Sequence, residues 1–257
     1  MIVYFSGTGN SLAIARQIGE ALGEQTMPLH QAVQADLSSE KVVGLVYPSY
    51  YFNAPEPVLR MVKELRINSG AYVFIIIPCG AQTGRAIWSV TKILKEKGVE
   101  VAYCHKIRVP DCSAIGFGRN PNDQAWKFER FAPRLEQIVS DLKARKHAHH
   151  FGGWSLAGWL CALPWMQKKT LPLLQPAVHA DKCVGCGTCK RVCTQGNISL
   201  VEAAGRTQPL AVIGDHCAQC LSCVHFCPQQ AVEIAGKPTL RERQYHHPKV
   251  KVADMVH

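Results

Sequence analysis

Eight of the twelve cysteines stand in two runs near the C-terminal end of the chain. Both runs have the spacing C-x2-C-x2-C-x3-C. Two-residue spacers let three successive thiolates converge on one cuboidal cluster, while the fourth cysteine points away from it toward a second cluster. We therefore predict two [4Fe–4S] clusters with crossed ligation. One set is Cys183, Cys186, Cys189 and Cys227, and the other is Cys217, Cys220, Cys223 and Cys193.

Zinc and disulfide bonds are the alternative uses of these cysteines. A structural zinc site usually takes its four ligands as two pairs. Three cysteines in the spacing C-x2-C-x2-C do not divide into such pairs, so one cysteine would be left without a place in the site. The N-terminal MIVYFSGTGNS carries no basic region ahead of its short apolar run, so it is not typical of a signal peptide. We expect a cytoplasmic protein with reduced thiols. Outside the runs, the other cysteines are expected mainly as buried small hydrophobes: Cys79, Cys104, Cys112 and Cys161.

The two runs belong to an internal repeat, HADKCVGCGTCKRVCTQGNISL against GDHCAQCLSCVHFCPQQAVEI. Halves of this size close only a small core, so metal must hold them together. Over about sixty residues the pattern resembles bacterial two-cluster ferredoxins. That family usually has proline after both fourth cysteines, but here Thr194 follows the first and Pro228 the second. Unlike proline, Thr194 has a backbone N–H, which would lie near a thiolate. Because hydrogen bonds to sulfur shift cluster potentials, we expect the cluster ligated by Cys193 to differ in potential from its neighbour.

A second chemical motif, Ser6-Gly7-Thr8-Gly9-Asn10-Ser11, follows the first apolar run. Small residues, hydroxyls and a helix N-terminus together can bind a phosphate group, although a plain turn between strand and helix would use similar residues. No P-loop lysine and no G-x-G-x-x-G is present. The string resembles the phosphate loop of flavodoxins, S/T-x-T-G-x-S/T, at every position. The resemblance implies FMN, bound by Ser6, Thr8, Gly9, Asn10 and Ser11.

Two further loops follow the third and fourth predicted strands, where ligands of open α/β sheets bind. They read Pro48-Ser49-Tyr50-Tyr51-Phe52-Asn53 and Pro78-Cys79-Gly80-Ala81-Gln82-Thr83-Gly84. Aromatic rings could stack on a flavin or pack between domains. In flavodoxins the matching loops contact the ring, which implies this role for Ser49, Tyr50, Tyr51, Phe52, Asn53, Cys79, Gly80, Ala81, Gln82 and Gly84.

The elements that must position these loops alternate along residues 1–146. Apolar runs without alternation, such as VVGLVY and YVFIII, are typical of strands covered on both faces. The pattern predicts an α/β fold with a five-stranded parallel sheet and helices on both sides. The resemblance to flavodoxins implies that this fold is flavodoxin-like. The expected strands are 2–5, 26–30, 42–47, 72–78 and 99–109, and the expected helices are 10–23, 56–66, 83–98 and 122–146.

The remaining chain divides by composition. Residues 147–176 are expected to form a hydrophobic interdomain linker, within which 151–166 could instead touch a membrane surface. Glycines and a proline interrupt any continuous amphipathic helix there, which favours the linker. Residues 177–236 are the expected ferredoxin domain, a small α+β unit. Residues 237–257 are the expected basic C-terminal tail, either solvated or docking on an acidic partner.

The formal charge of +10 alone would suggest nucleic acid as a partner. Two clusters with eight thiolates and a flavin phosphate would together remove about six positive charges, so nucleic acid is not expected.

The whole chain resembles flavodoxin–ferredoxin fusion proteins. This resemblance implies an electron carrier relaying electrons between FMN and the clusters, with protein donors and acceptors. The alternative is an FMN-dependent reductase of a quinone or similar small molecule. No paired carboxylates or catalytic triad mark a substrate site. Four histidines could donate protons but are more typical of packing or surface positions: His105, His225, His246 and His247.

Overall fold

The computed structural model describes the chain except residues 116–118, 151–155, 164, 167–174, 235 and 257. The chain forms two compact units. The sheet unit contains Met1–Ser6, Asn10–Val109 and Trp126–Gln167. The cysteine unit contains Gly7–Gly9, Pro110–Ala125 and Lys168–His257. The segment 7–9 and the segment 110–125 therefore pack with the C-terminal part of the chain.

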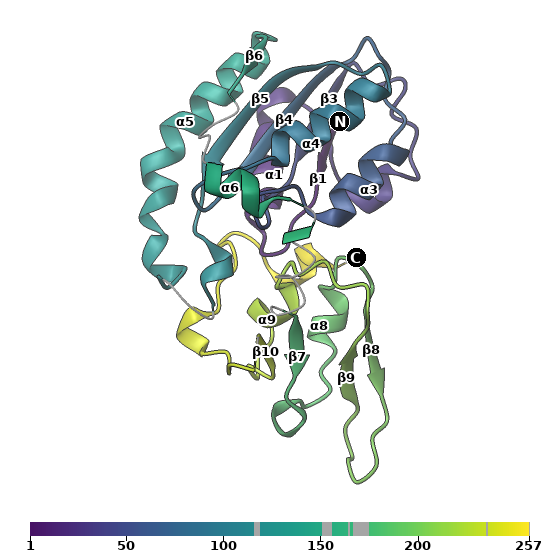
Figure 1. Cartoon of the computed structure of the whole chain (residues 1–257), viewed down its shortest axis with the longest axis vertical. Coiled ribbons are helices and arrows are strands. Elements are labelled where there is room, and N and C mark those ends of the chain that lie inside the picture. Colours follow the sequence, from purple (N-terminus) through teal and green to yellow (C-terminus); the bar gives the residue numbers. More distant parts are fainter. Residues whose placement is uncertain (116–118, 151–155, 164, 167–174, 235, 257) are drawn as a thin grey trace. The chain divides into compact units, whose positions relative to one another are not determined.

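The sheet unit is built on six parallel strands in the order β2-β1-β3-β4-β5-β6 (Figure 1). Their bounds are β1 Ile2–Tyr4, β2 Thr26–Pro28, β3 Val42–Val46, β4 Tyr72–Cys79, β5 Val101–Arg108 and β6 Ala148–His149. The first five have the order of the flavodoxin-like doubly wound fold. This confirms the predicted parallel sheet. The sixth strand has two residues, too few for any periodic signal, and pairs with β5 at Tyr103 and Cys104.

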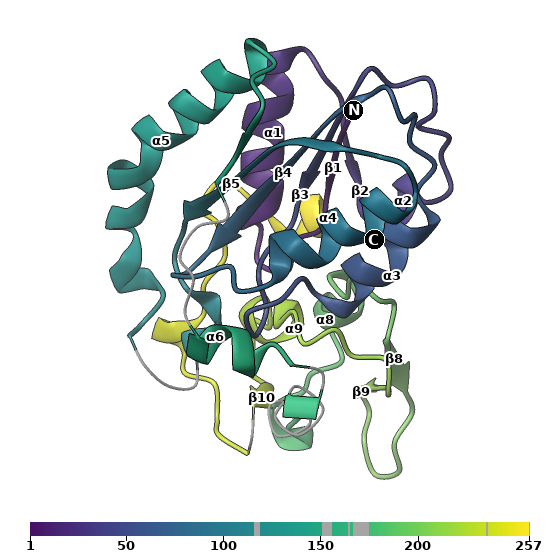
Figure 2. The same ribbon diagram turned by 45° about the horizontal axis from the view of Figure 1, so that its top comes forward.

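Helices cover both faces of this sheet (Figure 2). Helices α1 and α5 pack together on one face, and α3 and α4 pack together on the other. The helix bounds are α1 Asn10–Leu22, α2 Leu29–Ala32, α3 Glu56–Glu64, α4 Ala86–Glu96, α5 Trp126–Lys143 and α6 Leu156–Cys161. The predicted strand 26–30 is too long by two residues. Strand β2 ends at Pro28, and the short helix α2 begins at Leu29.

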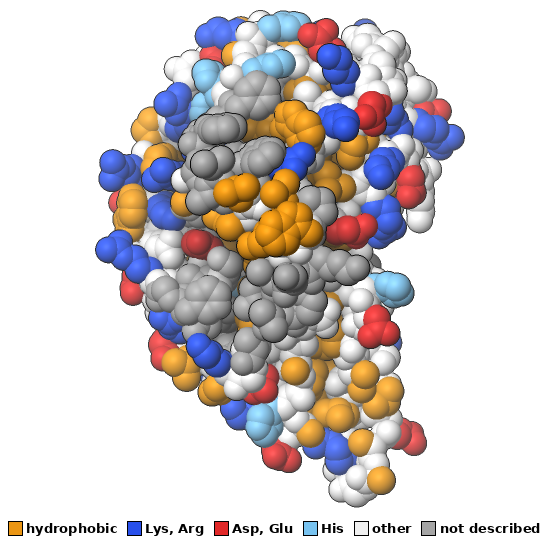
Figure 3. Space-filling model, viewed as in Figure 1, with side chains coloured by type: hydrophobic (Ala, Val, Ile, Leu, Met, Phe, Trp, Pro, Cys, Tyr) orange, Lys and Arg blue, Asp and Glu red, His pale blue; other side chains and the backbone are white. Residues whose placement is uncertain are grey.

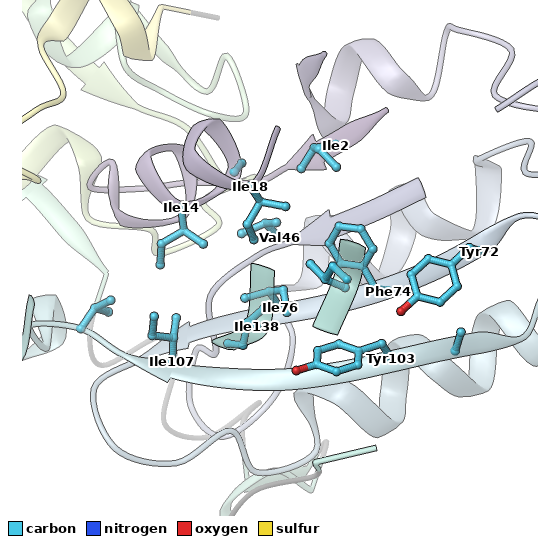
Figure 4. Close-up of a cluster of buried hydrophobic side chains, with 14 residues drawn as sticks. Ile2, Ile14, Ile18, Val46, Tyr72, Phe74, Ile76, Tyr103, Ile107 and Ile138 are labelled. Atoms are coloured by element: carbon cyan, nitrogen blue, oxygen red, sulfur yellow. The ribbon is translucent and has the colours of Figure 1, made fainter. Parts of the chain in front are cut away.

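A core of buried side chains holds α1 and α5 against the sheet (Figure 4). Ile14 and Ile18, four residues apart, project from one side of α1 onto Ile76 of β4. Every side chain of β4 is buried, as expected for a central strand covered on both faces. The Tyr103 hydroxyl at the rim of this core donates a hydrogen bond to Asp141 of α5, 3.2 Å away.

In its described residues, the cysteine unit contains two small antiparallel sheets and two one-turn helices. Strand β7 Pro176–Val178 pairs with β10 Val232–Ile234, and β8 Ile198–Val201 pairs with β9 Leu210–Ile213. Helices α8 Thr188–Arg191 and α9 Ser222–His225 occupy equivalent places in the two halves of the repeat. The residue before each helix has a left-handed backbone: Gly187 has φ 71° and Leu221 has φ 60°. The repeated sequence therefore gives a repeated conformation.

Short 3-10 helices complete this unit. They are η1 Cys112–Ile115, η2 Asn122–Gln124, η4 Ala180–Lys182, η5 Arg241–Arg243 and η6 Val252–Met255. The C-terminal segment packs on the segment 110–125, because the Asn122 side-chain amide donates to the carbonyl oxygens of Glu242 and Gln244. Tyr245, Val250 and Met255 are buried. The segment 237–256 is thus ordered structure in the part of the chain that the structure describes.

Among the described residues, none of the helices has both the length and the apolar character needed to cross a membrane. Hydrophobic side chains gather over α6 in Figure 3, where Leu160 is exposed. The predicted membrane contact at 151–166 falls partly on residues that lie outside the described chain. On the face shown in Figure 3, Lys and Arg side chains are interspersed with Asp and Glu.

Candidate iron–sulfur and flavin sites

Two cavities in the cysteine unit are each lined by four cysteines from both halves of the repeat. The first cavity, of about 350 Å³ including space open to solvent, contains one member from the second run. Its cysteines are Cys183, Cys186, Cys189 and Cys227. The second cavity, of about 330 Å³ measured in the same way, has Cys193 with Cys217, Cys220 and Cys223. The structure therefore brings together the same two groups of four that the spacing predicted as crossed ligand sets.

The cysteines of the two cavities also influence one another's pKa values. Burial, together with the nearby thiolates of Cys227, Cys183 and Cys186, raises the pKa of the Cys189 thiol to about 11. Burial also raises the pKa of Cys223, with further contributions led by Cys220 and Cys217. Since iron binds thiolates, loading either cavity must release protons from these groups. Four like charges become acceptable in such a cavity only when a cationic core neutralises them.

Backbone amides already point at the sulfur atoms that would carry this charge. The Asn197 N–H donates to Cys193 Sγ at 3.2 Å, and the Ala231 N–H donates to Cys227 Sγ at 3.2 Å. These residues are four positions after the fourth cysteine of each run, so the two donors are equivalent in the repeat. Hydrogen bonds of this kind stabilise bound thiolates. Both cavities therefore fit a cluster in the charge, number and surroundings of their ligands.

The described residues contain no group of three His, Cys, Asp or Glu side chains that could hold a metal ion. Side chains that bind a single ion lie close together around it. The four cysteines of an iron–sulfur cluster lie farther apart, around a cube of iron and sulfur, so the two cavities are the relevant geometry here.

Hydroxyl groups make the two cavities unequal. Thr194 donates from Oγ1 to Cys220 Sγ at 3.6 Å, and the Ser222 hydroxyl lies 3.3 Å from the same sulfur. In the other cavity, Thr188 Oγ1 lies 3.5 Å from Cys186 Sγ, and Pro228 at the position equivalent to Thr194 has no hydroxyl. The sequence drew attention to Thr194 for its backbone N–H. The structure adds its side chain as a donor to a ligand of the cluster that the crossed sets assign to Cys193.

The predicted phosphate loop joins β1 to α1, and its polar side chains are buried: Ser6, Thr8, Asn10 and Ser11. Helix α1 begins at Asn10 and runs for 13 residues, so its N-terminus directs partial positive charge at this loop. Gly9 has φ 90°, which favours glycine, and an added Cβ would lie 2.8 Å from Val250 Cβ. The loop thus has the small residues and the helix end that an FMN phosphate needs.

The two predicted ring loops follow β3 and β4, which are neighbours in the sheet, and they hold each other. The Ser49 hydroxyl donates to the Thr83 carbonyl oxygen, and the Ser89 hydroxyl donates to Asn53 Oδ1 at 2.8 Å. The Arg85 N–H donates to the Phe52 carbonyl oxygen at 2.7 Å. Loop 48–53 and loop 79–84 therefore lie side by side at the carboxyl ends of β3 and β4.

Loop 48–53 also has a strained backbone. Tyr51 and Phe52 have φ 49° and 61°, a conformation that costs residues with side chains about 1 kcal/mol or more each. The loop closes on itself through paired hydrogen bonds between Tyr50 and Asn53. Phe52 is exposed, Tyr50 and Tyr51 are half-buried, and Tyr50 packs edge-on against Phe5. Strain of this kind concentrates at ligand sites.

The other members of this predicted site differ in exposure. Cys79 is buried at the end of β4, Gly80, Gln82 and Gly84 are half-buried, and Ala81 is exposed. The Gly80 carbonyl oxygen accepts a hydrogen bond from the Lys127 ammonium at 2.9 Å, which fixes the start of this loop. Motif reasoning missed Lys127 and Ser89 and gave Thr83, inside the quoted loop, no role, because their contributions come from contacts between elements and not from sequence spacing.

The four histidines considered as proton donors are held in structural contacts. His225 Nδ1 accepts from the Tyr245 N–H, and its Nε2 donates to the Cys112 carbonyl oxygen. Burial lowers the pKa of His225 to about 4, so this ring is neutral at pH 7. Burial likewise lowers the pKa of His247 to about 4 and lowers that of His105. His246 stacks on Phe226 with ring centroids 4.9 Å apart.

Residues 182–231 match the family model of the 4Fe-4S dicluster domain. This segment is similar to iron–sulfur dicluster domains. The match contains all eight cysteines of the two cavities and supports iron–sulfur clusters and a role in electron transfer. Together with the strand order of the sheet unit, the dicluster domain confirms the predicted combination of a flavodoxin-like and a ferredoxin-like part.

Solved structures similar to this chain include flavodoxins. Fusobacterium nucleatum flavodoxin bound to flavin mononucleotide has 17% identity and a TM-score of 0.40; the alignment covers 56% of this chain and 96% of that one. The Streptococcus pneumonia TIGR4 flavodoxin has 18% identity and a TM-score of 0.37, with 56% and 97% covered. Megasphaera elsdenii flavodoxin has 21% identity and a TM-score of 0.32, with 41% and 82% covered. No curated protein matches the sequence.

Proposed function

We propose that this chain relays electrons between an FMN bound at the phosphate loop and two [4Fe–4S] clusters in the dicluster domain. Its partners would be a low-potential donor protein and an acceptor enzyme. The observation that carries this proposal is the pair of cavities in which each half of the repeat supplies one cysteine to the other half's set. FMN exchanges one or two electrons and each cluster exchanges one, so together they can gather or divide electron pairs.

The chain's own residues have distinct parts in this function. Cys183, Cys186, Cys189 and Cys227 would hold one cluster, and Cys193, Cys217, Cys220 and Cys223 would hold the other. The N–H groups of Asn197 and Ala231 stabilise sulfur charge in each set. Ser6, Thr8, Asn10 and Ser11 would bind the phosphate, and the loops 48–53 and 79–84 would contact the flavin ring.

The residues near the sulfurs are suited to electron transfer more than to proton transfer. His225, which lies beside the second run, is buried, neutral at pH 7 and engaged at both ring nitrogens. Cys189, Cys223 and Cys227 are likewise buried, whereas Cys186 is exposed. The reaction supported best is therefore outer-sphere electron exchange with protein partners.

Anaerobic stopped-flow spectroscopy tests the relay. The holoprotein is mixed with a reduced low-potential ferredoxin, and cluster and flavin absorbance are followed separately. We expect the clusters to be reduced first and the flavin to follow at a rate independent of the concentration of the donor. Rapid reduction of the clusters without later reduction of the flavin would contradict the relay. Steady turnover of a quinone by the protein would instead favour the reductase alternative.

A further inference from the structure

The Ser222 hydroxyl lies between a candidate cluster ligand and the phosphate loop. Its Oγ is 2.5 Å from the Gly7 carbonyl oxygen, to which it donates, and 3.3 Å from Cys220 Sγ. Ser222 is completely buried. All three residues belong to the cysteine unit, so these distances lie within one compact body. A side chain adjacent to Cys223 in sequence therefore touches both proposed cofactor sites.

Once Cys220 binds iron, both neighbours of the Ser222 hydroxyl can only accept a hydrogen bond, because a thiolate ligand has no proton and a carbonyl oxygen has none either. The hydroxyl has a single proton, so the two acceptors compete for it. The shorter distance to Gly7 indicates that the hydroxyl donates mainly to the carbonyl oxygen. Any change that draws the hydroxyl toward Cys220 weakens its hold on Gly7, and the reverse also holds.

The hydrogen bond to Gly7 fixes the direction of an amide in the phosphate loop. No cis peptide occurs in the described chain, so the Gly7 carbonyl and the Thr8 N–H point in opposite directions. The next carbonyl, that of Thr8, accepts from the His247 N–H at 2.9 Å. Two donors thus fix the directions of two successive peptide units, and with them the directions of the Thr8 and Gly9 N–H groups that an anion-binding loop would use.

We propose that Ser222 is a positioning residue that couples phosphate binding at residues 7–9 to the cluster held by Cys220. The inference rests on the proposed binding of FMN. When FMN is bound, its phosphate would favour the loop conformation in which Ser222 donates to the Gly7 carbonyl oxygen. The hydrogen bond from Ser222 to Cys220 Sγ would then be weaker. Because coupling between two sites is reciprocal, the phosphate affinity and the cluster potential must both depend on this hydroxyl.

The repeat supplies a matched control at Thr188. This residue precedes Cys189 as Ser222 precedes Cys223, and its hydroxyl lies 3.5 Å from Cys186 Sγ. Its other hydrogen bond is accepted from the Arg191 guanidinium at 3.3 Å. Thr188→Ala therefore removes an equivalent hydroxyl from the other cluster without removing a contact to residues 7–9.

The first measurement is the dissociation constant of FMN and of riboflavin, titrated into flavin-free protein whose cluster loading is verified by iron content. Riboflavin has the same ring but lacks the phosphate. We expect Ser222→Ala to weaken FMN binding about tenfold and to leave riboflavin binding unchanged, whereas Thr188→Ala leaves both unchanged. A second variant, His247→Pro, removes the N–H that donates to Thr8 and affects no cysteine. We expect it to weaken FMN binding as Ser222→Ala does, and it replaces Ser222→Ala if that variant fails to load its clusters.

The second measurement is the potential of each cluster, from EPR-monitored titrations with FMN or riboflavin bound. In the wild type, FMN should lower the potential of one cluster relative to riboflavin. In Ser222→Ala most of that difference should be lost, although the Coulomb effect of the phosphate remains.

Equal FMN affinities for wild type, Ser222→Ala and His247→Pro would overturn the coupling while the proposed function stands. Failure of the wild type to bind FMN at all would instead overturn the proposed flavin site.

Discussion

Thr194 is the residue at which the two halves of the repeat differ most clearly in chemistry. Its hydroxyl donates to Cys220 Sγ, while the equivalent position has Pro228. A donor to sulfur stabilises the more negative, reduced cluster and raises its potential. The difference in potential expected from the sequence is thus assigned to a specific hydrogen bond. At 3.6 Å this bond is long, so we expect a modest effect.

Thr194→Val removes this hydroxyl and keeps the side-chain shape. We expect the potential of one cluster to fall while the other is unchanged, as measured by protein-film voltammetry. Thr194→Pro should lower the same potential, since it removes both the hydroxyl and the backbone N–H. Pro228→Thr is the matched control in the first cavity and should alter only the other cluster. Unchanged potentials in both Thr194 variants would refute the assignment.

His247 should make the stability of the cysteine unit depend on pH. Its pKa is lowered to about 4 from 6.5, because the ring is buried and close to the charge of Lys249. The unfolded chain therefore binds a proton that the folded chain does not as the pH falls from about 6.5 to about 4. Stability is fully present above 6.5 and decreases through this window by up to about 3 kcal/mol.

The His247→Asn variant keeps an acceptor close to the position of Nδ1, which accepts from the Lys249 N–H. We expect its melting temperature, measured anaerobically, to fall less between pH 7 and pH 4.5 than that of the wild type. Equal decreases in the two proteins would show that His247 is not the titrating group.

At the scale of elements, the crossed cysteine sets depend on how α8 and α9 follow their left-handed residues Gly187 and Leu221. Each short helix carries the third cysteine of its run in its first turn and directs the chain so that the fourth reaches the other cavity. The spacing of the cysteines predicted the same two groups of four that line the cavities, because the reach of a three-residue spacer is set by backbone geometry.

Cys193→Ala tests the crossing of the ligand sets. The variant should lose about four of about eight iron atoms, because one cluster loses a ligand. Alkylation under anaerobic conditions, read by mass spectrometry, should then modify Cys217, Cys220 and Cys223. Modification of Cys183, Cys186 and Cys189 instead would show that each run holds its own cluster. Cys227→Ala is the matched variant and should expose the first-run cysteines.

The sheet was predictable from sequence for a similar physical reason. Continuous apolar runs such as YVFIII can be accommodated only by strands covered on both faces, and all five predicted strands are present. The strand β6 and the helix α2 were not predictable, because two to four residues give no period. Contacts that join distant segments, such as Ser222 with Gly7 and Ser49 with Thr83, also have no signal in spacing.

At the scale of the whole molecule, charge and cofactors must be considered together. The formal charge of +10 refers to the chain alone, and the eight cavity cysteines would add negative charge on binding iron. Burial raises the pKa values of Cys189 and Cys223, so cluster assembly is expected to be favoured by neutral to alkaline pH, where proton release is easiest.

The most direct test of the account is the cofactor content of the protein purified under anaerobic conditions. Iron, acid-labile sulfide and flavin would be quantified per chain together with a visible spectrum. Two four-cysteine cavities and one phosphate loop predict about eight iron, about eight sulfide and about one FMN. About four iron per chain would show that one cavity is not a full cluster site, and a protein with full iron but without affinity for FMN would contradict the relay.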